Sequence, residues 1–342
     1  MLILAIETSC DDTSCAVLEV KGTKSQKFKV LASVVSSQIK IHAPFGGVVP
    51  TLAAREHVKN LPVVFEQTLS QAGVSMHDID YIAVTQGPGL VIALLVGINF
   101  ARGLAYAYDK KIIPVNHIAG HIFSNWLLGT PVPFPLLNIV VSGGHTELIL
   151  MKKPGAYKNI GATRDDAAGE AFDKAARMLG LSYPGGPQIA ARAKNGNPKA
   201  YALPRPMIHS KNYEFSFAGL KTAVLYALRK EPSIKKNKKK LTNFCASFEQ
   251  AVADVIVAKT VRAAKEYKAK TVALSGGVSA NDRLRAVLSQ TVRAELPRVK
   301  LLIPEKKLTT DNAAMIAVAA FFERKNAVSW KRVDANPNLS LS

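Results

Sequence analysis

The chain opens with a short apolar strand, a polar turn and a second strand, and this pattern constrains the fold most. Residues 2–6 are apolar, residues 7–13 are polar and rich in side-chain oxygens, and residues 14–20 again favour a strand. Together they predict a β-hairpin. The same pattern returns at 136–141, 142–146 and 147–151. The two segments share little sequence, so only the strand–turn–strand pattern indicates a duplicated fold.

Strands and helices alternate after the first hairpin. Helical periodicity covers Thr51–Ala72 and ends at Gly73, Tyr81–Thr85 has the pattern of a strand, and the apolar run Gly87–Tyr108 predicts a buried helix. Further helices are predicted at 165–179, 215–228, 244–265 and 311–323, and strands at 271–274 and 299–303. A chain of 342 residues with this order predicts an α/β fold of two domains or one large bilobal fold.

The chain carries a large positive charge. It has 45 lysines and arginines against 25 aspartates and glutamates, a formal net charge of +20. Such an excess usually serves a polyanionic partner. Nucleic acid is favoured over a membrane, because no basic amphipathic anchor stands out. The alternative is a basic protein that its charge merely keeps in solution.

Cysteine usage and the first residues indicate a cytoplasmic protein. The chain has three cysteines and no Cys-x-x-Cys pair, which argues against a disulfide framework and a thiolate zinc site. The N-terminus has no basic segment and reaches Glu7 too early for a signal peptide. The most apolar run contains Asn99 and Arg102, so a core helix fits it better than a membrane span.

Two histidines in Asn116-His117-Ile118-Ala119-Gly120-His121 form the sharpest chemical motif. At this spacing on a helix both imidazoles stand on one face and can reach one metal ion. Asp311 is the best candidate for a third ligand. Two packed or solvated histidines are the alternative for the pair, and capping of the last helix is the alternative for Asp311. With no carboxylate between the histidines, the motif is not that of an H-E-x-x-H protease.

Three glycine pairs, at 143–144, 185–186 and 276–277, follow or interrupt predicted strands. Backbone N–H groups can approach an anion closely where no Cβ intervenes, as phosphate-binding loops require. The chain has neither a P-loop nor a dinucleotide-binding motif. The three pairs and the acidic first turn predict a nucleotide held between two lobes. The densest charge run, Lys235–Lys240, is predicted to be an exposed loop.

Eleven motifs follow one another in an order that is typical of one family. They are Ile6–Asp11, Gly46–Pro50, Gly87–Leu90, His117 with His121, Val141–Thr146, Asp165–Lys174, Tyr183–Pro187, Phe215–Phe217, Gly219–Lys221, Gly276–Asn281 and Thr310–Asn312. In this order the chain resembles the bacterial-type tRNA threonylcarbamoyladenosine transferases, the TsaD family. The resemblance runs from Leu2 to the helix after Asp311, nearly the whole chain.

The resemblance implies a two-lobed fold of the actin, Hsp70 and sugar-kinase type (the ASKHA fold), each lobe built on a ribonuclease-H-like mixed sheet. We expect residues 1–118 with 316–342 in the first lobe and 119–315 in the second. The implied reaction moves a threonylcarbamoyl group from threonylcarbamoyl-AMP to the exocyclic amine of the adenosine 3′ of the anticodon. The tRNAs concerned read codons that start with A, and AMP is released.

The resemblance also implies site residues, a metal and partners. His117, His121 and Asp311 match the family's metal ligands, with iron(II) usually assigned and zinc as the alternative. Its substrate contacts match Val140, Val141, Ser142, Gly143, Gly144, Asp173, Gly186 and Asn281, a site that ATP, ADP or AMP can also occupy. The family works with a degenerate paralogue of the TsaB type and a small ATPase of the TsaE type, and a synthase supplies the adenylate.

The first turn supplies the candidate catalytic residues. An adenine amine is a poor nucleophile, so most of the work must go into activating and positioning the electrophile. Asp11 is the candidate general base. Asp12 stands where the family usually has Glu, and one methylene less shortens the reach of its carboxylate. If that carboxylate orients the acceptor or the metal shell, this difference puts its role in question.

Three other functions compete with this one. A carbohydrate or carboxylate kinase of the same fold would share the glycine turns, but it has no need of the histidine pair or of so basic a surface. A metallopeptidase is disfavoured by the missing acid. A non-catalytic tRNA-binding scaffold would use the basic surface and would tolerate loss of Asp11 or His117.

Overall fold

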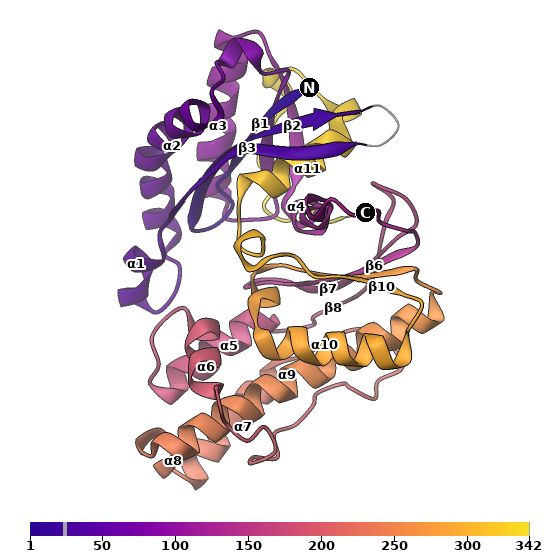
Figure 1. Ribbon diagram of the computed structural model, residues 1–342. Helices are drawn as coiled ribbons and strands as arrows, with labels where there is room; N and C mark the ends of the chain where they lie inside the picture. Colours follow the sequence, from indigo (N-terminus) through magenta and orange to yellow (C-terminus); the bar gives the residue numbers. More distant parts are fainter. Residues whose placement is uncertain (23–25, 342) are drawn as a thin grey trace. The chain divides into compact units, whose positions relative to one another are not determined.

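A computed structural model describes residues 1–22 and 26–341 (Figure 1). Contacts within the chain divide it into two compact units, Met1–Pro131 with Thr310–Ser342 and Val132–Thr309. The sequence instead predicts that the chain passes from the first lobe to the second between residues 118 and 119, and returns between residues 315 and 316. In the structure α4 (His117–Phe123) packs against α11 (Ala313–Glu323), which is why the first unit holds both of these segments.

The first unit contains a mixed sheet of five strands. They are β1 (Leu2–Glu7), β2 (Asp12–Lys21), β3 (Lys27–Ser37), β4 (Tyr81–Gly87) and β5 (Lys111–Asn116). The order is β3-β2-β1-β4-β5, with β1, β2 and β3 antiparallel and β1, β4 and β5 parallel. Buried residues run almost without a break along the central strand β1, as a strand covered on both faces requires.

Helices cover both faces of this sheet. The elements outside it are α1 (Ile39–His42), η1 (Ala43–Phe45), α2 (Pro50–Ala72), η2 (Met76–Asp78), α3 (Val91–Ala107), α4, η3 (Ser124–Leu128), α11, η6 (Arg324–Asn326) and η7 (Trp330–Arg332). Alternate residues of β1, such as Leu4 and Ile6, pack with α2 and α3, while α11 lies against β1 and β2 on the other face (Figure 1). The helices predicted at Thr51–Ala72 and within Gly87–Tyr108 are confirmed.

The second unit repeats the same sheet. Its strands are β6 (Leu136–Val141), β7 (Thr146–Met151), β8 (Tyr157–Ala162), β9 (Thr271–Ser275) and β10 (Lys300–Leu302). The order is β10-β9-β6-β7-β8, again with three antiparallel strands on one side and parallel neighbours on the other. The predicted fold class, α/β with a duplicated ribonuclease-H-like mixed sheet, is therefore confirmed.

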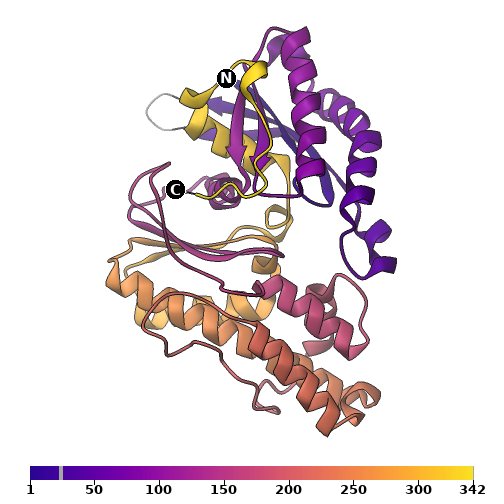
Figure 2. The ribbon, with the colours of Figure 1, turned by 180° about the vertical axis from the view of Figure 1, so that it is seen from behind.

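The long helix α9 (Lys238–Glu266) is the central helix of the second unit. With α10 (Asp282–Glu295) it covers one face of the sheet, as Figure 2 shows from behind. The unit also contains α5 (Ala168–Leu179), α6 (Gly185–Ala193), α7 (Ala218–Lys230), α8 (Ser233–Lys236), η4 (Gly277–Ala280) and η5 (Lys306–Leu308). No helix among residues 1–22 and 26–341 is long and apolar enough to cross a membrane.

The structure corrects four local predictions. The helix predicted from Asp165 begins at Ala168, because the Asp165 carboxylate instead accepts hydrogen bonds from the N–H groups of Phe217 and Ala218 at the start of α7. The glycine-rich sequence Tyr183–Pro187 predicts a loop, but Gly185 and Gly186 begin helix α6. The predicted loop Lys235–Lys240 is helical apart from Asn237, whose side chain caps α9. The helix predicted from Asp311 begins at Ala313.

Candidate metal centre and substrate loops

Both histidines lie on a fully buried helix. Strand β5 ends at Asn116, whose side-chain Oδ1 accepts hydrogen bonds from the N–H groups of Ile118 and Ala119 and so begins α4. Every residue from His117 to Phe123 is buried. The two imidazole rings meet edge to face with their centroids 4.7 Å apart. Solvated histidines, one of the two alternatives for this motif, are therefore excluded.

Gly120, between the two histidines, allows α4 to approach α11. A Cβ at Gly120 would lie 2.7 Å from the Ile316 side chain and 3.2 Å from that of Met315. On α11, Ala313 donates its N–H to Ser14 Oγ of β2, at 3.0 Å. These contacts fix the start of α11 beside the histidines.

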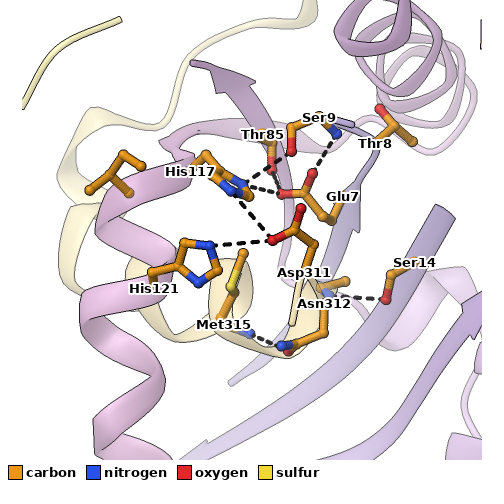
Figure 3. Close-up of polar contacts among 12 residues, drawn as sticks. Glu7, Thr8, Ser9, Ser14, Thr85, His117, His121, Asp311, Asn312 and Met315 are labelled. Atoms are coloured by element: carbon orange, nitrogen blue, oxygen red, sulfur yellow. Dashed lines mark hydrogen bonds and ion pairs between the residues drawn. The ribbon is translucent and has the colours of Figure 1, made fainter. Parts of the chain in front are cut away.

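Asp311 is not the cap of α11, because Asn312 has that role. The Oδ1 atom of Asn312 accepts a hydrogen bond from the N–H of Met315 at 3.1 Å. The carboxylate of Asp311 instead points between the two imidazoles, as Figure 3 shows, with Oδ1 at 3.5 Å from His117 Nε2 and 3.3 Å from His121 Nε2. The sequence alternative that made Asp311 a helix cap is therefore wrong.

The three side chains fit a metal ion. One ligand atom from each of His117, His121 and Asp311 lies within 4.8 Å of the other two. His121 is completely buried, its burial lowers its pKa, and its Nδ1 has no hydrogen-bond partner in the part of the chain described. A neutral imidazole aimed at a carboxylate and a second imidazole is the donor set of a divalent metal.

Glu7, at the end of β1, orients His117 from the other side. Its Oε2 lies 3.1 Å from His117 Nδ1 (Figure 3). The same oxygen accepts a hydrogen bond from the Thr85 hydroxyl at 2.5 Å, and Oε1 accepts one from the N–H of Ser9. Burial works against the charge of Glu7, but its attraction to His117 and its hydrogen bonds lower its pKa. A carboxylate at Nδ1 fixes the tautomer that leaves Nε2 available for a metal.

The same carboxylates favour a positive charge on or beside His117. Burial opposes protonation of the ring, but the charges of Asp311 and Glu7 raise the pKa of His117 to about 9. A proton or a metal ion can supply this positive charge. This group of side chains therefore favours a cation, which agrees with the donor set.

The negative charge of Asp311 acts on the acidic turn between β1 and β2, which contains Asp11 and Asp12. Burial, followed by repulsion from Asp311, raises the pKa of Asp11, and the same two causes raise the pKa of Asp12 to about 7. The Oδ1 atom of Asp12 is buried and has no hydrogen-bond partner among the residues described. The backbone of this turn is held by His57 of α2, whose Nε2 lies 3.0 Å from the Cys10 carbonyl.

The glycine turn of the second unit, Ser142–His145, occupies the place that the acidic turn has in the first unit. The Ser142 N–H donates to the His145 carbonyl at 2.8 Å, and the Ser142 hydroxyl accepts from the His145 N–H. Gly143 and Gly144 are exposed, and a Cβ at either would meet no atom within 4 Å. Val140 and Val141 are buried, so they can offer a ligand only backbone atoms.

Two other segments approach this turn and the strand before it, and the start of α6 packs against one of them, α5. Gly276 has φ +87° and lies so close to β6 that a Cβ there would be 2.4 Å from the Val141 carbonyl oxygen. A Cβ at Gly169 of α5 would be 2.6 Å from the Ser142 carbonyl oxygen. The carboxylate of Asp173 in α5 accepts a hydrogen bond from the N–H of Gly185 at 2.7 Å, which places Gly186 beside the middle of α5. These contacts connect the sequence-predicted substrate residues of the second unit.

The side chain of Asn281 is largely used within the protein. Its Oδ1 accepts from the N–H of Leu284 and so caps α10, and its Nδ2 donates to Glu249 Oε1 at 2.5 Å. One amide hydrogen is left for a ligand. Glu249, a buried carboxylate of α9, therefore orients Asn281.

Comparison with known proteins decides the family. The model of the tRNA N6-adenosine threonylcarbamoyltransferase family (TsaD) matches residues 29–318. The chain belongs to this family. A relative with that name from Thermosipho melanesiensis is 50% identical over 341 residues, with 100% of both chains covered. One from Geobacillus kaustophilus is 51% identical over 345 residues, with 99% of this chain and 96% of the relative covered.

A further relative of the same name, from Listeria monocytogenes, is 48% identical over 349 residues and covers 99% of this chain and 96% of its own. Among solved structures, YeaZ from Pseudomonas aeruginosa matches with 14% identity and a TM-score of 0.41, over 98% of each chain. Membership of the family makes the chain a transferase, and the family resemblance expected from the ordered motifs is confirmed.

Sequence reasoning missed two residues that orient the proposed site residues. The sequence pattern places Glu7 in a polar turn, and the signal that marks it as a buried functional acid is its position directly after five apolar strand residues. Glu249 lies in the middle of a long helix and gave no local signal, because its partner Asn281 is distant in sequence.

Proposed function

We propose that the chain transfers the threonylcarbamoyl group of threonylcarbamoyl-AMP to N6 of the adenosine 3′ of the anticodon. The tRNAs are those that read codons starting with A, and AMP is released. The observation that carries the proposal is the His117–His121–Asp311 group, with both histidines buried, within a segment that the family model matches. A kinase of this fold does not need such a group.

His117, His121 and Asp311 would hold one divalent metal. Two imidazoles and a carboxylate are the ligands of mononuclear iron(II) sites and also suit zinc, so we take iron(II) as the resident metal and zinc as the alternative. When bound, the ion supplies Lewis-acid chemistry toward a phosphate or carbonyl oxygen. Glu7 keeps the Nδ1 proton of His117 in place, so that Nε2 faces the ion.

The second unit would hold the AMP part of the donor. Gly143 and Gly144 present exposed backbone that no side chain covers, and N–H groups of such a turn bind phosphate oxygens. Asp173, Gly186 and Asn281 border the same loops, and Val140, Val141 and Ser142 contribute backbone. ATP, ADP and AMP share these groups with the donor and would occupy the same loops.

A carboxylate of the acidic turn would accept the proton that the adenosine amine loses. Asp11 and Asp12 both have raised pKa values, and that of Asp12 is about 7. A general base is most effective when its pKa lies near the working pH. We therefore assign the general base to one of these two residues. The pKa of Asp12 lies nearer the working pH, and Asp11, the candidate from the sequence, is the alternative.

The family resemblance also supports partners. We propose that a paralogue of the TsaB type and a small ATPase of the TsaE type work with this chain, and that a separate synthase supplies threonylcarbamoyl-AMP. Because the proposed substrate is a tRNA, we propose that the reaction takes place in the cytoplasm.

The test is transfer of labelled threonine to unmodified tRNA in the presence of the synthase and both partners. Wild type should label the tRNA, His117→Ala should not, and His209→Ala, which removes an exposed histidine, should match wild type. Label that persists in His117→Ala would still support the transferase activity but would refute the metal's role in it. No label with wild type would refute the transferase, and a phosphorylated product would then identify a kinase.

A further inference from the structure

More than half of the net charge of the chain lies in about one seventh of its length. Residues 192–240 contain 13 lysines and arginines against two glutamates, while the whole chain carries +20. This segment belongs entirely to the second unit. The mechanism proposed above uses none of its basic residues, so their concentration needs another explanation.

The fold gathers part of these basic residues at one end of the second unit, while Arg205 lies beside Asp254 in the middle of α9. There α8 packs against both α7 and α9, and α6 packs against α9, and Figure 1 shows α6, α7 and α8 at the lower left. A Cβ at Gly196, just after α6, would lie 2.5 Å from the Thr242 carbonyl oxygen in α9, and Asn197 donates its N–H to Asn243 Oδ1 at 2.9 Å. The end of α6 is therefore fixed beside the first turns of α9.

Six exposed cations stand at this end, which we call the basic end. They are Arg192, Lys194, Lys235, Lys236, Lys238 and Lys239. None of the six has a carboxylate partner within 4.0 Å among residues 1–22 and 26–341, whereas Lys240 is paired with Glu231 at 2.6 Å. Tyr226, with 61% of its surface exposed, lies on the adjoining helix α7. Unpaired cations together with an exposed aromatic ring on a neighbouring helix are typical of a nucleic-acid surface.

The basic end is close to the loops assigned to the substrate. Glu249 holds Asn281 by a hydrogen bond, and a rise of about 1.5 Å per residue puts Lys238 roughly 16 Å from Glu249 along α9. Helix α6 starts beside Asp173 and, with nine residues, ends about 14 Å away at Lys194. In a nucleic-acid duplex this is roughly five nucleotides of one strand.

We propose that the basic end is a docking surface for the phosphates of the tRNA whose adenosine is modified. This inference rests on the proposed function. Because lysine ammonium groups act as point charges, they would contribute affinity without sequence preference. The surface would hold different tRNAs equally well and leave their discrimination to contacts nearer the anticodon.

The test compares two variants with equal loss of charge. In the first, Lys235, Lys236, Lys238 and Lys239 are each changed to Gln, which keeps helix propensity. In the control, Lys268, Lys270, Arg293 and Arg298 are changed to Gln. These control residues are also exposed and lie near the other end of α9, where Lys265 pairs with Glu295 of α10 at 2.6 Å. The 29 residues of α9 separate the two sets by about 43 Å.

Binding of unmodified tRNA is measured at salt concentrations from about 50 to about 300 mM, which span the physiological range, together with the transfer rate in the complete system. The first variant should bind roughly 10- to 100-fold more weakly, and its salt slope should fall by about 0.7–0.9 for each phosphate that is no longer neutralised. Its kcat at saturating tRNA should stay that of wild type while KM rises. The control variant should bind like wild type.

Equal affinity and salt slope in the first variant and wild type would overturn the proposal. So would a variant that binds tRNA normally but loses its partner proteins, which would assign the basic end to an acidic protein face. If wild type binds tRNA but transfers nothing, the proposed function fails, while the comparison of affinities still decides whether the basic end binds tRNA. Matching circular dichroism spectra verify that both variants are folded.

Discussion

The two units share one sheet order but carry opposite chemistry in the turn after their first strand. In the first unit the turn after β1 holds Asp11 and is packed tightly, since a Cβ at Gly89 would lie 2.6 Å from the Ser9 carbonyl oxygen. In the second unit the turn after β6 holds Gly143 and Gly144, and nothing lies within 4 Å of a Cβ at either. One topology therefore supports a side-chain site in one unit and a backbone site in the other.

The difference teaches that sheet order positions a site but does not choose its chemistry. Antiparallel β1–β2 and β6–β7 both present a turn beside the ends of parallel strands. Carboxylates and imidazoles in the first unit are suited to a metal and to protons. Exposed N–H groups in the second unit are suited to an anion. Substitutions in each unit should therefore fail in different ways.

The largest effect is expected for His121→Ala. Removing a buried ligand should abolish stoichiometric metal and lower the transfer rate by roughly 100-fold or more. Elemental analysis of the purified protein and the labelled-threonine assay measure the two quantities. His209→Ala is the matched control. Full metal content in His121→Ala would contradict the assignment of the metal to the side chains of the first unit.

Gly276→Ala should damage the second unit through its backbone. The positive φ and the close Val141 carbonyl leave no room for a methyl group, so we expect the free energy of unfolding to fall by roughly 2–4 kcal/mol. Denaturant titration measures it. Gly144→Ala, where a Cβ meets nothing, should change stability by less than about 1 kcal/mol. Equal losses in both variants would contradict the close packing at Gly276.

Glu7→Gln should weaken metal binding without unfolding the first unit. The amide has the shape of the carboxylate but no charge to hold the His117 Nδ1 proton, so metal affinity should fall by about 10- to 100-fold. Competition with a chelator gives the affinity. Glu56→Gln, at a partly exposed glutamate paired with Lys59, should leave the metal affinity unchanged.

Asp12→Asn should alter how stability depends on pH. The folded pKa of Asp12, about 7, lies above its ordinary value of 3.8. The folded state therefore holds the proton more tightly than the unfolded state, and the contribution of Asp12 to stability falls as pH rises from about 4 to about 7. The amide removes this loss, so Asp12→Asn should be more stable than wild type at pH 8 and closer to it at pH 4. Thermal unfolding of metal-free protein at both values checks the sign, and a variant that is less stable at pH 8 would refute it.

The sequence by itself determined the elements whose signals are local. The apolar strand and polar turn after Leu2, the buried helix α3 and the similar hairpin in the second half followed from hydrophobic pattern alone. It also singled out His117 and His121, because four-residue spacing on a helix has only one geometry. The ordered motifs added the family and, through it, the substrate loops.

Only the tertiary structure decided which neighbouring polar residue does what. Asp311 and Asn312 are both good helix caps, and it is the packing of α11 on β2 and α4 that makes Asn312 the cap and turns Asp311 to the histidines. Asp165 likewise caps α7, because α7 starts beside it in space and not in sequence. The pKa of Asp12 and the role of Glu7 depend on burial and on charges distant along the chain, which no local pattern can encode.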